Sequence, residues 1–147
     1  MGAMEAITAK DKTLKMRATV IFRRDEQILF VRKRNSKWNL PGGKVELGET
    51  PLEAALREMA EETGLKFDDL AYVSEYKEDS VVHFLFEAGP AAQRSTGKKP
   101  RPCSEIDDCR WLTMAEMAKR NVRRPIQSLL KRCASDQANR FQAKAAG

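Results

Sequence analysis

Short apolar stretches bounded by turn-forming residues recur along much of the chain. Five of them have the length and the β-branched or aromatic content of strands: residues 16–22, 27–33, 71–77, 81–87 and 107–112. Four polar residues, 23–26, separate the first two stretches, and residues 78–80 separate the next two. The pattern therefore predicts two strand pairs, each joined by a short turn, and a later single strand.

A helix with defined ends is predicted between the two strand pairs. Thr50 and Glu53 have the spacing of a capping box, and Pro51 occupies the first helical position, where its missing N–H does no harm. Gly64 can adopt the left-handed conformation that ends a helix, so the last helical residue is expected near Thr63. Four residues have the spacing of a core-facing stripe: Leu52, Ala55, Leu56 and Met59.

The rest of the chain predicts two shorter helices and polar connections. Residues 115–120 and 126–133 are the helical segments, and Pro125 opens the second. Residues 89–104 are rich in Gly, Pro, Ser and Lys, and they predict either a mobile flap over a substrate or a disordered loop. In a chain of 147 residues, this order of strands and helices indicates one mixed α/β domain.

Three glutamates share the side of the predicted 51–63 helix that faces away from the apolar stripe: Glu58, Glu61 and Glu62, with the small Ala54 beside them. Like charges three or four residues apart repel by about a few tenths of a kcal/mol per pair, so helix stability does not favour the cluster. A hard divalent cation removes this repulsion, and such ions also recruit phosphate oxygens. We therefore expect a metal site here; for any single glutamate, a solvated helix face is the alternative.

The glutamates are part of a longer motif with fixed spacing. Its nine positions are Gly43, Glu49, Arg57, Glu58, Met59, Glu61, Glu62, Gly64 and Leu65. This string matches the complete Nudix box, so the chain resembles the Nudix hydrolases over roughly residues 16–133. The resemblance implies the Nudix fold, in which a mixed β-sheet is sandwiched between α-helices. It also implies cleavage of a diphosphate bond with Mg²⁺, or with Mn²⁺ in its place.

The resemblance assigns metal ligands within the motif. It implies that Glu58 and Glu62 are the firmer ligands, and that Glu61 is either a third ligand or reaches the metal through water. One glycine of the turn that follows Pro41 supplies a carbonyl ligand in the family, because glycine lets the backbone approach closely. We take Gly43 as the candidate.

The resemblance also indicates catalytic residues beyond Glu61 and Glu62. The family's equivalent of Arg57 orients the loop glutamate, here Glu49. Relatives often use a further glutamate as general base, and Glu105, just before the strand predicted at 107–112, is the candidate. A surface glutamate at the end of a loop is the alternative for Glu105.

Candidates for substrate binding are Lys44, Asn39 and Phe84. Lys44 can neutralise a phosphate, or it is an exposed loop lysine. Asn39 lies in the same turn as the paired glycines. Phe84 either borders a base pocket or packs in the core. His83, the only histidine, is expected to be a residue of the sheet rather than a catalytic one.

The charge is unevenly distributed along the chain. Its net value is +6, but residues 10–37 carry +7, residues 43–79 carry −7 and residues 94–147 carry +8. Basic flanks beside an acidic centre favour attraction of a phosphorylated substrate, with ordinary solubilising charge as the alternative. Nucleic-acid binding stays open through these flanks, although no basic stripe interleaved with aromatic residues supports it.

Composition predicts a cytoplasmic protein without a membrane segment. No apolar stretch approaches 18 residues, and no charged-then-apolar leader opens the chain. Cys103, Cys109 and Cys133 form no C-x-x-C pair, which favours reduced thiols. We expect an N-terminal extension at residues 1–15, a Nudix hydrolase domain at 16–133 and a flexible C-terminal tail at 134–147. Monomer and homodimer both remain open.

Three functions agree with the sequence. The resemblance is strongest to MutT-type enzymes, which cleave a nucleoside triphosphate, oxidised bases included, into a monophosphate and pyrophosphate. A second possibility is hydrolysis of ADP-ribose, a dinucleotide, a sugar nucleotide or a capped RNA end, which gives two phosphorylated fragments. The third is a non-catalytic module that senses nucleotides; the complete set of glutamates argues against it.

Overall fold

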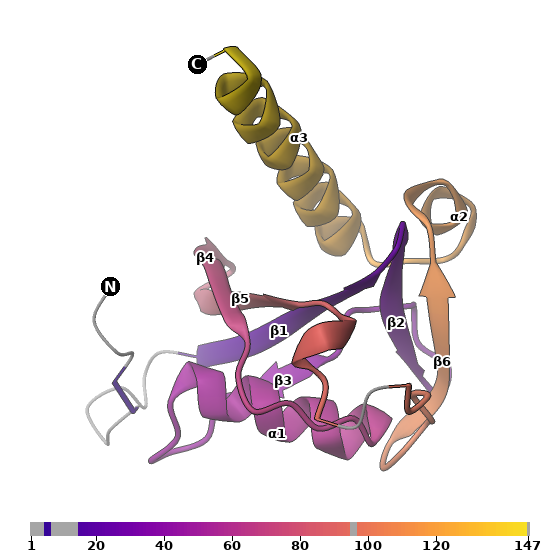
Figure 1. Ribbon diagram of the computed structural model, residues 1–147. Helices are drawn as coiled ribbons and strands as arrows, with labels where there is room; N and C mark the ends of the chain where they lie inside the picture. The colour runs from indigo at the N-terminus through magenta and orange to yellow at the C-terminus, as the bar shows by residue number, and fades with distance from the viewer. Residues whose placement is uncertain (1–4, 7–14, 95–96, 147) are drawn as a thin grey trace.

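The computed structural model describes residues 5–6, 15–94 and 97–146 (Figure 1). Its elements in chain order are β1 (Lys15–Arg24), β2 (Gln27–Lys33), β3 (Gly42–Lys44), α1 (Pro51–Thr63), β4 (Ala71–Glu78), β5 (Val81–Ala88), the 3-10 helix η2 (Pro90–Ala92), β6 (Ile106–Leu112), α2 (Met114–Lys119) and α3 (Arg124–Ala146). The five predicted strands and three predicted helices are present. The additional strand β3 has only three residues, which is too few for a hydrophobic period to reveal it.

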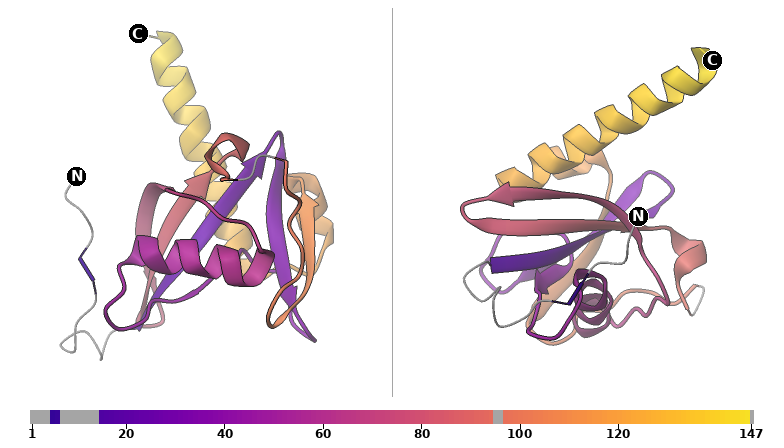
Figure 2. Two further views of the ribbon diagram at one scale, coloured as in Figure 1. Left: turned by 60° about the horizontal axis from the view of Figure 1, so that its bottom comes forward. Right: turned by 90° about the vertical axis from the view of Figure 1, so that its left-hand side faces the viewer.

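A mixed sheet forms the centre of the molecule, with the order β4-β5-β1-β2-β6 and with β3 beside β1. β1 is parallel to β5, and the other paired strands are antiparallel. β1 and β2 pair only next to their turn, at Arg23–Ile28 and Arg24–Gln27. Beyond it the two strands diverge, and the chain around β3 enters the gap between them (Figures 1 and 2).

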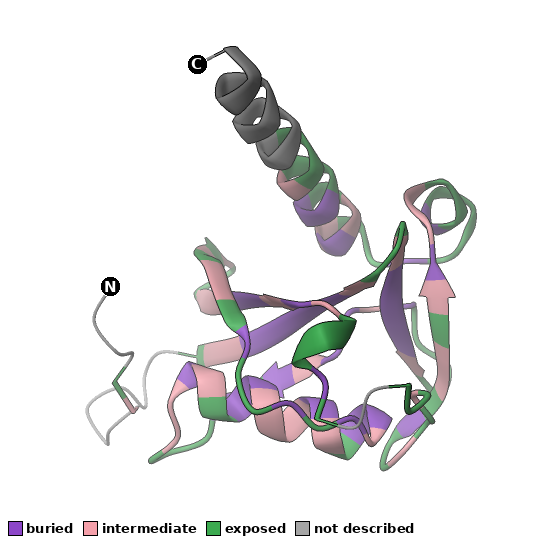
Figure 3. Cartoon of the chain, viewed as in Figure 1, coloured by how far each residue is buried: buried purple, intermediate pink, exposed green. Residues whose placement is uncertain are grey.

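Two apolar clusters cover opposite faces of the sheet. Buried residues lie in the central strands, along α1 and at the start of α3 (Figure 3). Val20 and Ile21 are consecutive in β1, and their side chains enter different clusters because successive strand residues point to opposite faces. Val20 packs in the cluster that contains Met59 of α1, and Ile21 packs in the one that contains Met117 of α2 and Leu130 of α3. The predicted α/β class, a mixed sheet sandwiched between helices, is therefore confirmed.

Helix α1 begins and ends as predicted. The Thr50 and Glu53 side chains exchange hydrogen bonds with each other's backbone N–H at 3.1 and 3.0 Å, and Gly64 ends the helix with φ of 74°. All four residues of the predicted stripe contact the core cluster. The buried face is wider than predicted, because Ala54 is also fully buried in this cluster rather than lying beside a ligand.

The described part of the connection at residues 89–104 lies along α1 and the residues that follow it. Within its described part, Arg94 donates a backbone hydrogen bond to Lys66, Arg101 to Thr63 and Cys103 to Glu62. These contacts hold the segment along the C-terminal end of α1. Backbone groups at and after the end of α1 thus give the described residues their hydrogen-bond partners, while a mobile flap or a disordered loop stays a prediction.

Helix α3 extends to Ala146 instead of ending near Cys133. Residues 134–146 contain several alanines and neither Gly nor Pro, so nothing in them ends a helix. Side chains beyond Ser135 lie outside the described residues, as does most of the expected N-terminal extension at 1–15. In the described part of the chain, no helix is long and apolar enough to cross a membrane.

Candidate active site

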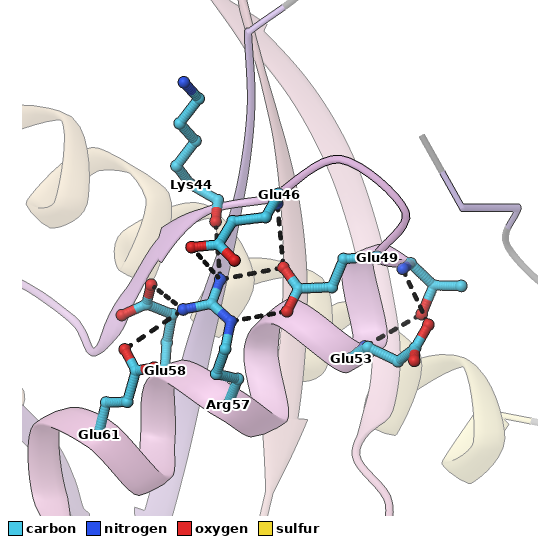
Figure 4. A network of polar contacts seen from close by, with 8 residues as sticks. Lys44, Glu46, Glu49, Glu53, Arg57, Glu58 and Glu61 are labelled. Atoms are coloured by element: carbon cyan, nitrogen blue, oxygen red, sulfur yellow. Dashed lines mark hydrogen bonds and ion pairs between the residues drawn. The ribbon is translucent and has the colours of Figure 1, made fainter. Parts of the chain in front are cut away.

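Arg57, in the middle of α1, joins the helix to the loop that carries Glu46 and Glu49 (Figure 4). Its Nε and Nη2 atoms donate to the two carboxylate oxygens of Glu49 at 2.6 and 3.0 Å, and Nη2 also donates to the Lys44 carbonyl at 3.0 Å. Nη1 donates to Glu58 at 2.9 Å and to Glu61 at 3.3 Å. The planar guanidinium fork suits such paired contacts, so Arg57 fixes the loop against the helix.

These contacts set the protonation of the groups around Arg57. The hydrogen bond to Glu49 raises the pKa of Arg57, and the same bond lowers the pKa of Glu49. For Glu58, burial raises the pKa, and the hydrogen bond from Arg57 opposes that rise. The lowered pKa favours the anionic form of Glu49. In Glu58, burial makes the charged form less favourable than it is in water.

Glu62 is almost fully buried, with an exposed fraction of 3%. Its carboxylate accepts a hydrogen bond from the Gly42 N–H at 2.8 Å, and burial raises its pKa to about 7. The sequence placed Glu62 on the helix side that faces away from the core and therefore did not predict this burial. The cover comes from the segment around β3, which enters the sheet beside α1.

The paired glycines allow this close approach. A Cβ atom on Gly42 would collide with the Ala18 carbonyl oxygen, and one on Gly43 would collide with the Glu58 carboxylate. A side chain at Gly42 would therefore push β3 away from β1, whereas one at Gly43 would displace the Glu58 carboxylate. The backbone of the turn lies directly against Glu58 as a result.

The donor set was compared with the needs of a metal ion. Among the described side chains, no three or more acidic, histidine or cysteine residues form a preformed metal site. Glu58 and Glu62 nevertheless fit a hard divalent cation, because both offer desolvated carboxylate oxygens. After burial, the neighbouring charge of Glu58 further raises the pKa of Glu62, and a cation would relieve this repulsion. Glu61 is 53% exposed and lies beside Arg57 (Figure 4).

The buried carboxylate opens onto a cavity on the other face of the sheet. Glu62 belongs to α1, yet it lines a cavity of about 600 Å³ together with Tyr76, His83 and Ile126. Tyr76 and Ile126 belong to the apolar cluster on the α3 side of the sheet. The gap between β1 and β2 therefore lets a residue of one helical layer reach a cavity in the opposite layer.

Comparison with known proteins identifies this arrangement. A model of the NUDIX domain matches residues 13–133, which is most of the chain. The chain belongs to the NUDIX domain family. The matched span includes β1 to β6, α1, α2 and the first part of α3.

Three relatives of the Nudix chain illustrate its similarity at the sequence level. A "MutT-like protein" of Streptomyces ambofaciens is 36% identical over 70% of this chain and 66% of its own length. "Phosphatase NudJ" of Shigella boydii is 32% identical over 65% of each chain. A Mycobacterium tuberculosis protein named provisionally as an 8-oxo-dGTP diphosphatase is 37% identical over 55% of this chain and 57% of its own length. The chain thus spans less than two thirds of the curated relatives it matches.

Solved structures agree with the fold. A NUDIX hydrolase from Nitrosomonas europaea has a TM-score of 0.72 at 23% identity, covering 87% of this chain and 74% of its own. A MutT NUDIX hydrolase from Burkholderia pseudomallei has a TM-score of 0.67 at 19% identity, covering 82% and 98%. At these identities the likeness concerns the Nudix fold alone.

The structure brings most of the predicted box residues together, but it separates the candidates for substrate binding. Asn39 lines the cavity, while its side-chain oxygen accepts a hydrogen bond from the Leu40 N–H at 2.8 Å. Lys44 is exposed on β3 and is not part of the cavity lining. Phe84 packs against the α1 cluster, on the opposite side of the sheet from the cavity. Its neighbour in β5, His83, faces the cavity instead.

Glu105, the candidate general base, lies at the start of β6. Its carboxylate is 3.0 Å from the Lys33 ammonium group in an exposed ion pair. Lys33 lines the cavity, and the charges of Lys33 and Glu105 both act on the pKa of Glu62, although less than burial does. Glu105 is therefore near enough to Glu62 for its charge to act on that carboxylate, and it is joined to the cavity wall through Lys33.

Sequence reasoning missed most of the cavity wall. Arg17, Lys33, Lys37 and Arg123 contribute its cations, and the rings of Tyr76 and His83 stack with centroids 4.6 Å apart. The one available signal was strand alternation, which places Arg17 on the same face of β1 as the core residue Ile21. Nothing in the sequence shows that this face is hollow at one end.

Proposed function

We propose that the protein hydrolyses a nucleoside triphosphate to a nucleoside monophosphate and pyrophosphate, in a reaction that depends on a divalent cation. The main support is that Glu62 of the Nudix box lies both beside Glu58 and in the wall of the cavity. A diphosphate near the box carboxylates would then have its nucleoside in the cavity. The name of the Mycobacterium tuberculosis relative, provisionally an 8-oxo-dGTP diphosphatase, supports this choice of substrate.

Glu58 and Glu62 would hold Mg²⁺, with Gly43 offering its carbonyl and Glu61 available from the exposed side. When bound, the cation would neutralise phosphate charge and lower the pKa of a water molecule. The protein itself would hold the carboxylates and the loop in position. Arg57 keeps Glu49 and the loop against α1, and the Gly42 N–H holds one oxygen of Glu62.

Glu105 is proposed to accept the proton of the attacking water. It is exposed, and Lys33 is its ion-pair partner at 3.0 Å. A substrate phosphate would compete for Lys33, because a lysine binds phosphate as a point charge. Glu105 would then be released to act as a base when substrate is present, which links proton transfer to substrate binding.

A cavity of about 600 Å³ is large enough for a nucleoside, and four cations line it: Arg17, Lys33, Lys37 and Arg123. Its three acidic groups are Glu62, Glu78 and Asp79. Glu62 and the Tyr76–His83 stack lie in different parts of the lining. A nucleotide can therefore place its phosphates near Glu62 and its nucleoside near the Tyr76–His83 stack.

The test is a panel of nucleoside triphosphates and nucleoside diphosphate derivatives, with the products identified by chromatography. We expect pyrophosphate and a monophosphate from at least one triphosphate, with no turnover in excess chelator and recovery on addition of Mg²⁺. Two phosphorylated fragments from ADP-ribose or a dinucleotide, with no turnover of triphosphates, would replace this substrate class by the second one. Hydrolysis that continues in excess chelator would exclude the metal-dependent reaction.

A further inference from the structure

A second hollow adjoins the cavity along a shared wall. Its volume is about 410 Å³, and it lies between the end of β4 and the start of α3. Tyr76, Glu78 and Pro125 line both spaces, so they form a ridge between them. We call the smaller space the outer hollow. Its basic side chains are Lys77, Arg124 and Arg132, and its one acidic side chain is Glu78.

Two consecutive arginines serve the two spaces. Arg123 lines the cavity, and Arg124, the first residue of α3, lines the outer hollow. Both lie at the N-terminal end of the helix, where the helix dipole is positive and acidic residues are favoured. The first turn of α3 contains no acidic residue. Helix stability therefore disfavours this pair, and an anion bound near it would reverse the effect.

Three basic side chains of this region make no ion pair with a described acid, although Glu78 lines the same hollow. Among the described side chains, those of residues 5–6, 15–94 and 97–135, none of the ion pairs involves Lys77, Arg123 or Arg124. The charges of two arginines also act on Tyr76, which is part of the ridge. Burial and the charge of Glu78 raise the pKa of the Tyr76 hydroxyl, and the charges of Arg123 and Arg132 act in the opposite direction.

We infer that the outer hollow binds a second phosphate of the substrate, attached to the ribose on the side remote from the reacting phosphates. This inference rests on the proposed function, because it takes the 5′-phosphates to lie near Glu62. A nucleoside in the cavity then has its far side at the Tyr76–Pro125 ridge. A phosphate on its ribose hydroxyl would cross the ridge and meet Lys77 and Arg124.

Two kinds of substrate carry such a phosphate. One is a nucleotide with a terminal ribose phosphate, and the other is an oligonucleotide whose first phosphodiester occupies the outer hollow. Both contain a nucleoside that is phosphorylated at two positions. Arg124 would bind the oxygens of the terminal phosphate in the first case and those of the phosphodiester in the second. The reaction itself is unchanged: water attacks one phosphorus, and pyrophosphate leaves from the 5′ end.

Equilibrium binding tests the site independently of turnover. Dissociation constants for wild type with Mg²⁺ would be measured by calorimetry for adenosine 5′-monophosphate, adenosine 3′,5′-bisphosphate and the 5′-phosphorylated dinucleotide pApA, with the guanine series in parallel. We expect the second phosphate to tighten binding about tenfold, the effect of one charged hydrogen bond. Tighter binding of pApA than of the bisphosphate would indicate an oligonucleotide, and the reverse a terminal phosphate.

Matched charge reversals localise the effect. Arg124→Glu should bring the ratio of the two dissociation constants close to one, and Arg124→Gln should reduce it. Arg120→Glu changes the net charge equally but lines neither space, so the wild-type ratio should persist. Circular dichroism would establish that each variant is folded. A ratio near one in wild type, or an unchanged ratio in Arg124→Glu, would overturn the inference. Loss of pyrophosphate release with the ratio retained would instead count against the proposed reaction alone.

Discussion

The carboxylate of Glu62 accepts a hydrogen bond from the backbone N–H of Gly42 at 2.8 Å, although the two residues are 20 positions apart. This bond joins the C-terminal half of α1 to the glycine turn that precedes β3. Because Glu62 also lines the cavity, the bond places a desolvated carboxylate where α1, the gap in the sheet and the cavity meet.

Replacing Glu62 by Gln should reduce turnover by at least about 100-fold, since a ligand substitution should cost no less than loss of a group that orients a ligand. The amide keeps the size of the side chain and can still accept from Gly42. The fold should therefore persist, as monitored by circular dichroism. Glu75→Gln, an exposed acid on β4, is the matched control. Wild-type turnover by Glu62→Gln would remove this residue from the site.

The same substitution should change the pH dependence of stability when metal is removed by a chelator. Burial raises the pKa of Glu62 from 4.5 to about 7. Below pH 4.5 the group is protonated in both states and carries no penalty. As pH rises to 7, the unfolded chain loses this proton first, so the folded state loses on the order of 3 kcal/mol. Urea unfolding at pH 5 and pH 8 should show this decline in wild type and a smaller one in Glu62→Gln.

Arg57→Lys should impair both the site and the loop. A lysine cannot reproduce the two contacts to Glu49 together with those to Lys44 and Glu58. We expect turnover to fall about 10- to 100-fold and the unfolding free energy to fall by about 1–3 kcal/mol. Steady-state kinetics and urea denaturation measure the two effects. Arg94→Lys, in the exposed pair with Asp68, should change neither, and equal effects in both variants would contradict the special position of Arg57.

Gly43→Ala should displace the Glu58 carboxylate. The added Cβ would collide with this carboxylate, which is the end of a flexible side chain and can turn away without moving the backbone. Turnover should therefore fall, whereas thermal unfolding should change little. In Gly89→Ala the new Cβ meets only the Arg23 carbonyl oxygen at 4.0 Å, so this variant should resemble wild type. Wild-type turnover in Gly43→Ala would mean that the turn has more room than the structure shows.

Glu105→Gln should lower kcat by about 100-fold or more with little change in KM if Glu105 is the general base. The pH profile of kcat should lose its acidic limb as well, a change that a merely structural residue would not cause. Asp107→Asn, also exposed on β6, is the control. A kcat and pH profile like those of wild type would leave proton removal to another group.

Local features of the fold could be predicted well, because neighbours in the sequence determine them. The capping box at Thr50, the stop at Gly64 and the apolar stripe of α1 all depend on residues within a few positions of one another. The end of α3 was harder to predict, since it required noticing that nothing after Cys133 stops a helix. For Phe84 the sequence left a base pocket and core packing open, because both faces of β5 carry apolar residues and alternation alone does not say which face holds the cavity.

The sequence by itself determined that Arg57, Glu58, Glu61 and Glu62 lie on one capped helix with a glycine turn before it, because helical geometry converts spacing into position. Only the tertiary structure decided that Glu62 is buried and reaches a cavity on the opposite face of the sheet. That outcome depends on the divergence of β1 from β2 and on the segment that fills the gap. Both are contacts between residues far apart in the chain, and no local period encodes them.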